Sequence, residues 1–383
     1  MVGSWPRSRA LLQAQKSKRL GQLDDRDFQR LADTEIRQLL AAESRIGVDL
    51  VTDGELRRDN FYSFVAEKLS GVKLMTLAEM LEHVDDKLSF ERLLQTLDVP
   101  AYSISNPTCT GRISRSRPLA VDELRFIKQH TDKPVKIPLP GPYLLTRAMF
   151  VPEVTRQVYA SKEELAQDVV KLLRAEIAEL IAEGASFIQL DEPVLTEVAF
   201  HPAGTRTFMC ASLASRGSSA EELEFAVQLL NEVVAGFSGP ILGMHVCRGN
   251  WSQNESILLH GSYSPLKPYL ERVHVDQLVL EYATERAGEI MPFEGKSLGL
   301  GVVNPRSEQL ESVEQIVSSV EGALRHFSPQ RIHLNPDCGF ATFSNSPVNE
   351  SRVAEAKMQR IVEAAAELRH RFVPGTKVEH SKG

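Results

Sequence analysis

Short apolar runs alternate with longer amphipathic segments along this chain of 383 residues, and this alternation limits the possible folds. Ala, Leu and Glu recur at helical spacing over 162–184, 219–236 and 312–327, and Gly184 and Gly236 stand where helices are expected to end. Alternation of strands and helices favours parallel β/α units. The runs typical of strands cover 48–53, 133–139, 185–191, 239–246, 275–282, 296–303 and 331–337.

Together with MVGSW at the start, these runs make eight expected strands, the number that closes an α/β barrel. We therefore predict an α/β fold, a (β/α)8 TIM barrel, that takes up residues 1–383 as a single domain. Residues 71–118 interrupt the alternation, and we predict that they form an insertion after the second strand, with a β-hairpin near 100–116. A surface loop without regular structure is an equal alternative for this insertion.

The composition argues against several classes of function. Apolar residues make up 42% of the chain and charged residues 25%, a balance typical of a globular protein. The net charge is −7 with dispersed Lys and Arg, so we expect neither a nucleic-acid partner nor membrane association. The four cysteines, Cys109, Cys210, Cys247 and Cys338, lie far apart, which favours free thiols and a cytoplasmic location over a disulfide framework. The oligomeric state is left open.

Polar side chains follow several expected strands, at the end where the chemistry of a β/α barrel takes place. They are Asp53 and Glu55 after the second strand, Asp191 after the fourth, His245 and Cys247 at the end of the fifth, Glu281 after the sixth and Cys338 after the eighth. Alternate residues of a strand point to the same side, so His245 and Cys247 aim at one point. Glu281 and Cys338 reach that point across the mouth of the barrel.

Two thiolates, one imidazole and one carboxylate make a ligand set that suits Zn²⁺. Each residue also has an ordinary structural interpretation: the first two end a core strand, Cys338 belongs to a turn, and Glu281 is a solvated charge. The recurrence of all four at strand ends favours a zinc site formed by His245, Cys247, Glu281 and Cys338.

Several motifs resemble the catalytic C-terminal barrel of the cobalamin-independent methionine synthase family. These are VGSWP (2–6), DGELRRDNF (53–61), PLPGPYLLT (138–146), FIQLDEPVL (187–195), HVC (245–247), Glu281 and NPDCGF (335–340), which together span nearly the whole chain. The two-barrel enzymes of this family carry a further N-terminal barrel, for which this chain has no room.

The resemblance implies a role for each site residue. His245, Cys247, Glu281 and Cys338 correspond to the zinc ligands. The resemblance further implies that Asp191 binds the amino group of homocysteine with Glu55 as its acidic partner, and that the backbone at Gly3 and Ser4 meets the carboxylate. The implied reaction is methylation of homocysteine to methionine by a methyl donor.

The ligand charges agree with this chemistry. Only the thiolate form of a thiol attacks, and coordination to Zn²⁺ deprotonates it. Two cysteinates and one glutamate give the zinc site a net charge of about −1, which favours alkylation of a bound thiol over activation of water. Glu281 is also a candidate for the ligand that leaves when the substrate sulfur arrives. Arg248 and Asn250 are either substrate contacts or residues that hold the loop.

Two alternatives keep the zinc site but change its use. One is an alkyltransferase of the epoxyalkane:coenzyme M transferase type, although the acidic residues Glu55 and Asp191 favour a thiol that carries an amino group. The other is a binding protein in which zinc is structural and its coordination closed.

The methyl donor is where the sequence departs from the family. Methylfolate-using members carry a histidine after the seventh strand that is thought to protonate the departing folate, and the alignment of 301–316 places Arg306 there. An arginine stays protonated, with a pKa above ~12, so it does not readily deliver a proton. We therefore expect methyltetrahydropteroyl-triglutamate to be a poor donor, and a smaller or activated methyl carrier, such as a methyl-corrinoid or a sulfonium compound, to be a better one.

Overall fold

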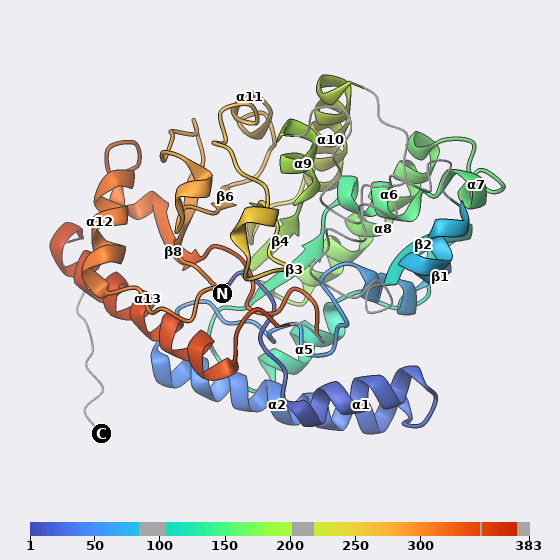
Figure 1. Ribbon diagram of the computed structural model, residues 1–383, viewed down its shortest axis with the longest axis horizontal. Coiled ribbons are helices and arrows are strands. Elements are labelled where there is room, and N and C mark those ends of the chain that lie inside the picture. The colour runs from blue at the N-terminus through green and yellow to red at the C-terminus, as the bar shows by residue number, and fades with distance from the viewer. Residues whose placement is uncertain (84–104, 201–217, 345–346, 374–383) are drawn as a thin grey trace.

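A computed structural model describes residues 1–83, 105–200, 218–344 and 347–373 of the chain (Figure 1). Within these residues a parallel sheet of six strands lies at the centre, in the order of the sequence. Its strands are β3 (Lys136–Pro140), β4 (Phe187–Asp191), β5 (Ile241–Val246), β6 (Gln277–Leu280), β7 (Ser297–Val303) and β8 (Ile332–Pro336). Sequential parallel strands require crossover connections; most of these contain an α-helix, whereas the connection from β6 to β7 contains only a 3-10 turn (Glu285–Ala287).

The helices cover the outer side of this sheet (Figure 1). The longer ones are α1 (Arg9–Arg19), α2 (Asp25–Ile46), α5 (Val121–Lys128), α6 (Pro142–Met149), α8 (Lys162–Ala182), α10 (Ser219–Val234), α12 (Val313–Ala323) and α13 (Ser351–Phe372). The short ones are α3 (Leu77–Met80), α7 (Pro152–Thr155), α9 (Val194–Phe200) and α11 (Lys267–Leu270). Short 3-10 turns lie at η1 (Ser63–Glu67), η2 (Leu81–His83), η5 (Glu255–Ile257), η6 (Glu285–Ala287) and η7 (Pro329–Arg331).

The ends of the expected helices follow from local capping chemistry. The side chain of Ser161 accepts a hydrogen bond from the Glu164 amide at the start of α8, and Ser218 and Ser312 form capping boxes at α10 and α12. Gly184 and Gly236 follow α8 and α10 with φ of +80° and +77°, which is the conformation expected just after a helix. The helices expected over 162–184, 219–236 and 312–327 are therefore confirmed.

Residues 1–5 and 48–53, where the first two strands were expected, do not form regular strands. Val51 makes an isolated parallel bridge with Val135, in which Val51 N–H donates to Pro134 O and Lys136 N–H donates to Val51 O. The next donor from β3 in this direction would be residue 138, a proline without an N–H, so the ladder stops there. The N-terminal segment joins the segment after β8 to the segment around residue 54: Phe340 N–H donates to Ser4 O, and Trp5 N–H donates to Gly54 O. The structure thus shows an α/β fold with a parallel sheet, without a continuous ladder around a closed barrel.

The insertion contains a two-stranded antiparallel sheet. Strand β1 (Leu69–Thr76) pairs with β2 (Ser105–Arg115) from Leu69↔Arg115 to Thr76↔Ser105. The expectation of a hairpin near 100–116 was therefore wrong. Residues 105–115 form a single strand, and its partner is β1, which lies about thirty residues earlier in the chain. Residues 84–104, including part of the acidic segment of this insertion, lie outside the described residues.

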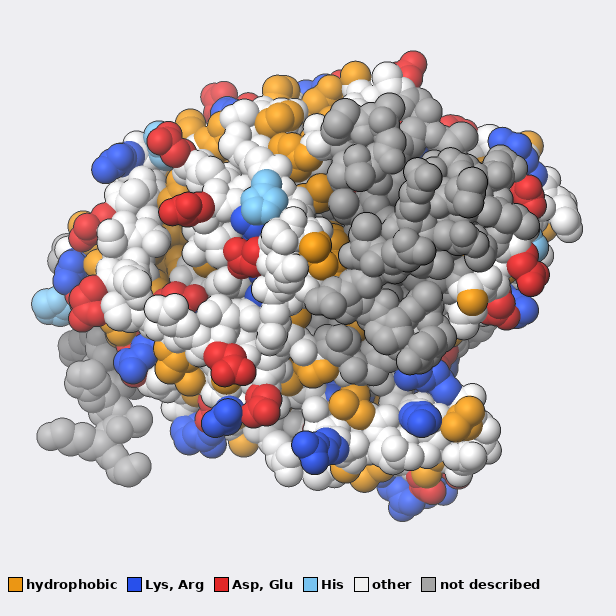
Figure 2. Space-filling model, viewed as in Figure 1, with side chains coloured by type: hydrophobic (Ala, Val, Ile, Leu, Met, Phe, Trp, Pro, Cys, Tyr) orange, Lys and Arg blue, Asp and Glu red, His pale blue; other side chains and the backbone are white. Residues whose placement is uncertain are grey.

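The core lies on both faces of the parallel sheet. All residues of β3, β4 and β6 are buried, and most of them are apolar, as expected for parallel strands that are covered on both faces. On the face shown in Figure 2, acidic and basic side chains of the described residues are interspersed over the surface. No helix among the described residues is long and apolar enough to cross a membrane.

Candidate active site

Three metal-competent side chains meet at the carboxyl ends of β5 and β8. His245 is the penultimate residue of β5, Cys247 follows its last residue, and Cys338 comes two residues after β8. One ligand atom from each residue lies within 4.8 Å of the others, and all three residues are at least nine-tenths buried. Side chains from two strands that are not neighbours in the sheet thus converge on one point.

The histidine is oriented as a metal ligand would be. His245 Nδ1 lies 3.1 Å from the carbonyl oxygen of Val279, and because a carbonyl only accepts, Nδ1 carries the proton. Nε2 is therefore unprotonated in the neutral ring, and it is buried without a hydrogen-bond partner among the described residues. A second-sphere carbonyl on one ring nitrogen and a free lone pair on the other is the usual arrangement of a metal-bound histidine.

The two cysteines are close enough to share a proton. A hydrogen bond with Cys338 lowers the pKa of the Cys247 thiol well below its ordinary value, and the same contact raises the pKa of Cys338. Both are free thiols, as is Cys109, whereas Cys210 lies outside the described residues. Paired sulfurs beside an imidazole suit Zn²⁺, which prefers Cys and His ligands.

Glu281 directly follows β6, but it is not part of the group of three residues whose ligand atoms lie within 4.8 Å of one another. Its Oε2 accepts a hydrogen bond from the backbone N–H of Arg248 at 2.9 Å. The guanidinium groups of Arg248, Arg286 and Arg306 lie 3.6–3.7 Å from its carboxylate oxygens. Burial raises the pKa of Glu281 to about 7, although Arg286 and Arg306 oppose this rise.

The acidic residues Glu55 and Asp191 come from different loops. Asp191 ends β4 at the same level as His245 on β5, and its Oδ1 accepts a hydrogen bond from Gln189 Nε2 at 2.7 Å. Glu55 follows Gly54 in a tight turn in which both residues have positive φ, 65° and 55°, and the Asp53 side chain accepts from the Glu55 N–H. Burial raises the pKa of Asp191 to about 6 and that of Glu55 to about 7.

One cavity joins these groups. A side chain at Gly3 would collide with Glu55 Oε1, so only a glycine lets this carboxylate approach the N-terminal segment. The cavity contains every expected site residue except Glu281. Its lining is Val2, Gly3, Ser4, Glu55, Phe61, Asp191, Pro193, His245, Cys247, Asn250, Cys338, Gly339 and Thr342.

Comparison with known families identifies the chain. Residues 1–367 match the model of the cobalamin-independent synthase catalytic domain. The chain belongs to this family.

Curated relatives and solved structures agree with the assignment. The chain is 28% identical to a methionine synthase of Sulfurisphaera tokodaii over 88% of this chain and 84% of the relative. It is 26% identical to a methionine synthase of Thermococcus kodakarensis over 96% and 92% of the two chains. A B12-independent methionine synthase from a Shewanella species, solved with selenomethionine, has a TM-score of 0.68 at 21% identity and covers 93% of this chain and 92% of its own. At that identity the likeness supports the fold alone.

The loop after β5 shows what Arg248 and Asn250 do in this member of the family. Arg248 Nε donates to Gly261 O at 2.7 Å, and its guanidinium lies 3.8 Å from the centre of the Tyr263 ring. Asn250 Nδ2 donates to Gly339 O at 2.6 Å, which ties this loop to the loop that carries Cys338. Both contacts hold the loop, and Asn250 also lines the cavity.

Sequence reasoning missed polar residues below the acidic pair. Gln189 and Lys136 are buried inside the sheet, where Gln189 bonds Asp191 and the Lys136 ammonium donates to Met1 O at 3.0 Å. Burial lowers the pKa of Lys136 to about 8, against the opposing effect of Asp191 and Glu55. Gln189 is two residues before Asp191 in β4, so the two side chains lie on the same face of the strand, and this spacing could have predicted their contact.

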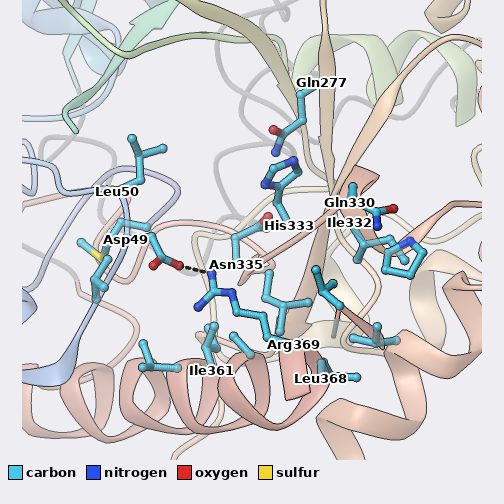
Figure 3. A pocket seen from close by; sticks show the side chains of 18 of the residues that line it. Asp49, Leu50, Gln277, Gln330, Ile332, His333, Asn335, Ile361, Leu368 and Arg369 are labelled. Carbon is cyan, nitrogen blue, oxygen red and sulfur yellow. Dashed lines mark hydrogen bonds and ion pairs between the residues drawn. The ribbon is translucent and has the colours of Figure 1, made fainter. Parts of the chain in front are cut away.

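A second, larger cavity of about 390 Å³ lies at the amino ends of the strands, between the sheet and α13 (Figure 3). Apolar residues such as Ile361 and Leu368 form much of its wall, and Asp49 pairs with Arg369 at 2.5 Å. His333, Gln277 and Asn335 line it from the strands. Among the described residues, the group of metal-competent side chains is that of His245, Cys247 and Cys338, and none of these three lines this cavity.

Proposed function

We propose that the protein is an S-methyltransferase that methylates homocysteine to methionine, with Zn²⁺ held by His245, Cys247, Cys338 and Glu281. The observation that carries this proposal is the single cavity in which three metal-competent atoms face the carboxylates of Glu55 and Asp191. Membership of the family gives the reaction class, and its curated relatives are methionine synthases.

The residues fit a zinc ion. The Nε2 of His245 and the two adjacent sulfurs supply three ligands. Oε1 of Glu281, which has no hydrogen-bond partner among the described residues but lies near Arg286 and Arg306, is available as the fourth. When bound, Zn²⁺ supplies the positive charge that keeps a substrate thiol ionised at neutral pH. Three anionic ligands leave that thiol electron-rich, so it stays nucleophilic.

The acidic pair selects the substrate. Asp191 and Glu55 lie in the same cavity as the cysteines, and a carboxylate pair favours an ammonium group over the sulfonate of coenzyme M. We place the amino group of homocysteine between these residues and its carboxylate at the backbone of Gly3 and Ser4. The sulfur then forms a bond to the methyl carbon, while the bond from that carbon to the donor breaks and its electron pair leaves with the donor.

Arg306 occupies the position where methylfolate-using relatives are expected to carry the group that protonates the departing folate. Its Nη1 donates to Asn250 Oδ1 at 3.1 Å, and it pairs with Glu255 and Asp337 at 3.2 and 3.5 Å. Nearby acids raise its pKa further, so it stays a cation and gives no proton to a leaving group. We propose that the donor is a small or activated methyl carrier whose departure needs no proton from this residue.

We also propose that the segments 2–5 and 48–53 complete a (β/α)8 barrel and that residues 1–383 form one domain. The support is the chain of hydrogen bonds that runs from Phe340 through Ser4 and from Trp5 to Gly54, and the bridge from Val51 to Val135. Such a barrel brings the strand ends around a common mouth.

The test is methionine formation from homocysteine with the zinc-loaded protein and one donor at a time. We expect turnover with a methyl-corrinoid or a sulfonium donor, and little with the triglutamate methylfolate. Turnover of about 1 s⁻¹ or faster with the folate, which is within the ordinary enzyme range, would overturn the donor assignment but keep the reaction. No methionine with any donor, and no homocysteine binding, would overturn the function itself.

A further inference from the structure

Glu281 is surrounded by cations that do not bond to it. Its Oε1 lies 3.6 Å from Arg286 Nη2 and 3.7 Å from Arg306 Nη1, and it has no hydrogen-bond partner among the described residues. Arg286 Nη2 and Arg306 Nη2 are likewise buried without one. A carboxylate within a few ångströms of two guanidinium groups would normally close to bidentate contact.

Other anchors explain why the Arg306 guanidinium stays at this distance. Its Nε lies 3.2 Å from Glu255 Oε1, and its Nη1 donates to the side chain of Asn250. Asn250 is itself bonded to the loop of Cys338, so these contacts hold the Arg306 guanidinium in a position 3.7 Å from Glu281 Oε1. Arg306 therefore attracts the Glu281 carboxylate electrostatically, without a direct hydrogen bond.

Burial strengthens the electrostatic attraction between Arg306 and Glu281. Glu281 and Arg306 are almost fully buried, so their interaction is weakly screened. Cys247 and Glu281 are near enough for the sulfur's charge to raise the pKa of the carboxyl. Arg286 and Arg306 thus attract the same carboxylate oxygen that a metal ion would need, so this attraction competes with coordination.

We propose that Arg306 is a positioning residue that restrains the Glu281 carboxylate and so weakens the hold of this site on its metal. The inference rests on the proposed function in one respect, namely that Glu281 is a zinc ligand. It assigns to Arg306 a role in ligand availability that is separate from its failure to protonate a donor. It also assigns the opposite effect on the metal to Glu255, because Glu255 pairs with Arg306 and so competes with Glu281 for its charge.

Zinc affinity measured by competition with a chelator tests this without any turnover. Arg306→Gln removes the restraining charge, and we expect zinc to bind roughly tenfold more tightly, in the range of effects seen for residues behind metal ligands. Arg306→Lys keeps the charge but loses the Nε and Nη1 contacts that fix its position, so its gain in zinc affinity should be smaller than that of Arg306→Gln, and an equal gain would contradict a role of the charge. Arg352→Gln makes the same charge change on an exposed part of α13 and should have no effect.

A double-mutant cycle with Glu281→Gln decides whether the effect passes through this carboxylate. Glu281→Gln alone should weaken zinc binding, and in that background Arg306→Gln should change the affinity less than about twofold. An equal gain in both backgrounds would mean that Arg306 simply repels the metal, and would overturn the proposal. So would the absence of any gain, or a loss of affinity, in Arg306→Gln.

Glu255→Gln covers the case in which Arg306→Gln does not fold. Glu255 is partly exposed, so its neutralisation is tolerable, and it frees Arg306 to pair more closely with Glu281. Zinc should then bind several-fold more weakly, and this loss should vanish with Glu281→Gln; a gain or no change would contradict the proposal. If Glu281→Gln leaves the affinity unchanged, the ligand set of the proposed function fails together with this inference, whereas the outcomes above concern Arg306 alone.

Discussion

Two cavities in the described part of the chain lie at opposite ends of the same strands and differ in how their polar groups are satisfied. At the carboxyl ends, three buried polar atoms have no hydrogen-bond partner among the described residues: His245 Nε2, Glu281 Oε1 and Asp337 Oδ2. At the amino ends, the larger cavity has apolar walls, and its Asp49 is paired with Arg369. Buried polar atoms without a hydrogen-bond partner cost stability unless a ligand satisfies them, and among the described residues no side chain that lines the larger cavity carries such an atom, so this comparison favours the carboxyl ends as the ligand site.

The comparison teaches that volume is a poor guide to the site in this fold. Strand ends place side chains from many segments around one point, and polar residues there are free to serve chemistry. At the amino ends, α13 supplies much of the largely apolar wall of the larger cavity (Figure 3), and we expect this packing to contribute to stability. Substitutions at the two ends should therefore affect different measurements.

The largest effect is expected for the cysteines. Cys247→Ser or Cys338→Ser should remove most of the bound zinc, since serine is a poor ligand, while the fold persists because a core of this size does not depend on one metal. Metal content by elemental analysis and the far-ultraviolet circular dichroism spectrum measure the two effects. His333→Ala, in the amino-end cavity, serves as the control and should keep about one zinc per chain. Full zinc in both serine variants would contradict the site.

Asp191→Asn should weaken homocysteine binding far more than zinc binding. The change removes a charge-assisted contact to the substrate ammonium group, which costs roughly 2–4 kcal/mol when the pair is desolvated. Calorimetric titration of the zinc-loaded protein gives the affinity. Asp49→Asn makes the same change at the amino end, where the pair is exposed, and should leave homocysteine affinity unchanged. An unaltered affinity in Asp191→Asn would point to a thiol without an amino group.

Ile361→Ala tests the other end. Ile361 is 4% exposed on α13, and its truncation should lower the free energy of unfolding by about 2 kcal/mol or more, because it enlarges an apolar cavity. Denaturant unfolding gives this value. Activity per folded molecule should stay that of the parent protein, and a specific loss of activity would show that the amino-end cavity takes part in the reaction.

The smallest effect is a dependence on pH. Burial raises the pKa of Glu55 to about 7 and that of Asp191 to about 6, and only the ionised carboxylates attract an ammonium group. Homocysteine should therefore bind more weakly as the pH falls, by roughly tenfold from pH 8 to pH 6, since protonation of Glu55 comes first. Glu55→Gln should flatten this part of the profile. A profile that stays as steep in Glu55→Gln would assign the titration to other groups, such as the metal ligands.

Much of the site follows from strand geometry that is visible in the sequence. His245 and Cys247 are two residues apart on a strand, which forces their side chains to the same side, and the structure brings them together with Cys338. Gly3, Ser4, Glu55 and Asp191 line the same cavity, as expected. The roles of these residues in binding and catalysis stay predictions that the experiments above address.

The insertion and the surroundings of Glu281 were not predictable in this way. Strand β2 pairs with β1 across a long stretch of chain, and the partner of a strand depends on contacts that no local pattern records. Glu281 was expected simply as a fourth ligand, yet three arginines from the loops after β5, β6 and β7 surround it. The separation of these residues in sequence hides their proximity.

The sequence by itself determined the residue types, the alternation of elements and the side of each strand on which a residue lies, because these depend on chain geometry over a few residues. Tertiary structure alone decided which loops meet. It placed Gln189 and Lys136 beneath the acidic pair, and it set Arg306 between Glu255 and Glu281. Burial and charge act through space and not along the chain, so the electrostatic state of the site emerges only when the strands are assembled.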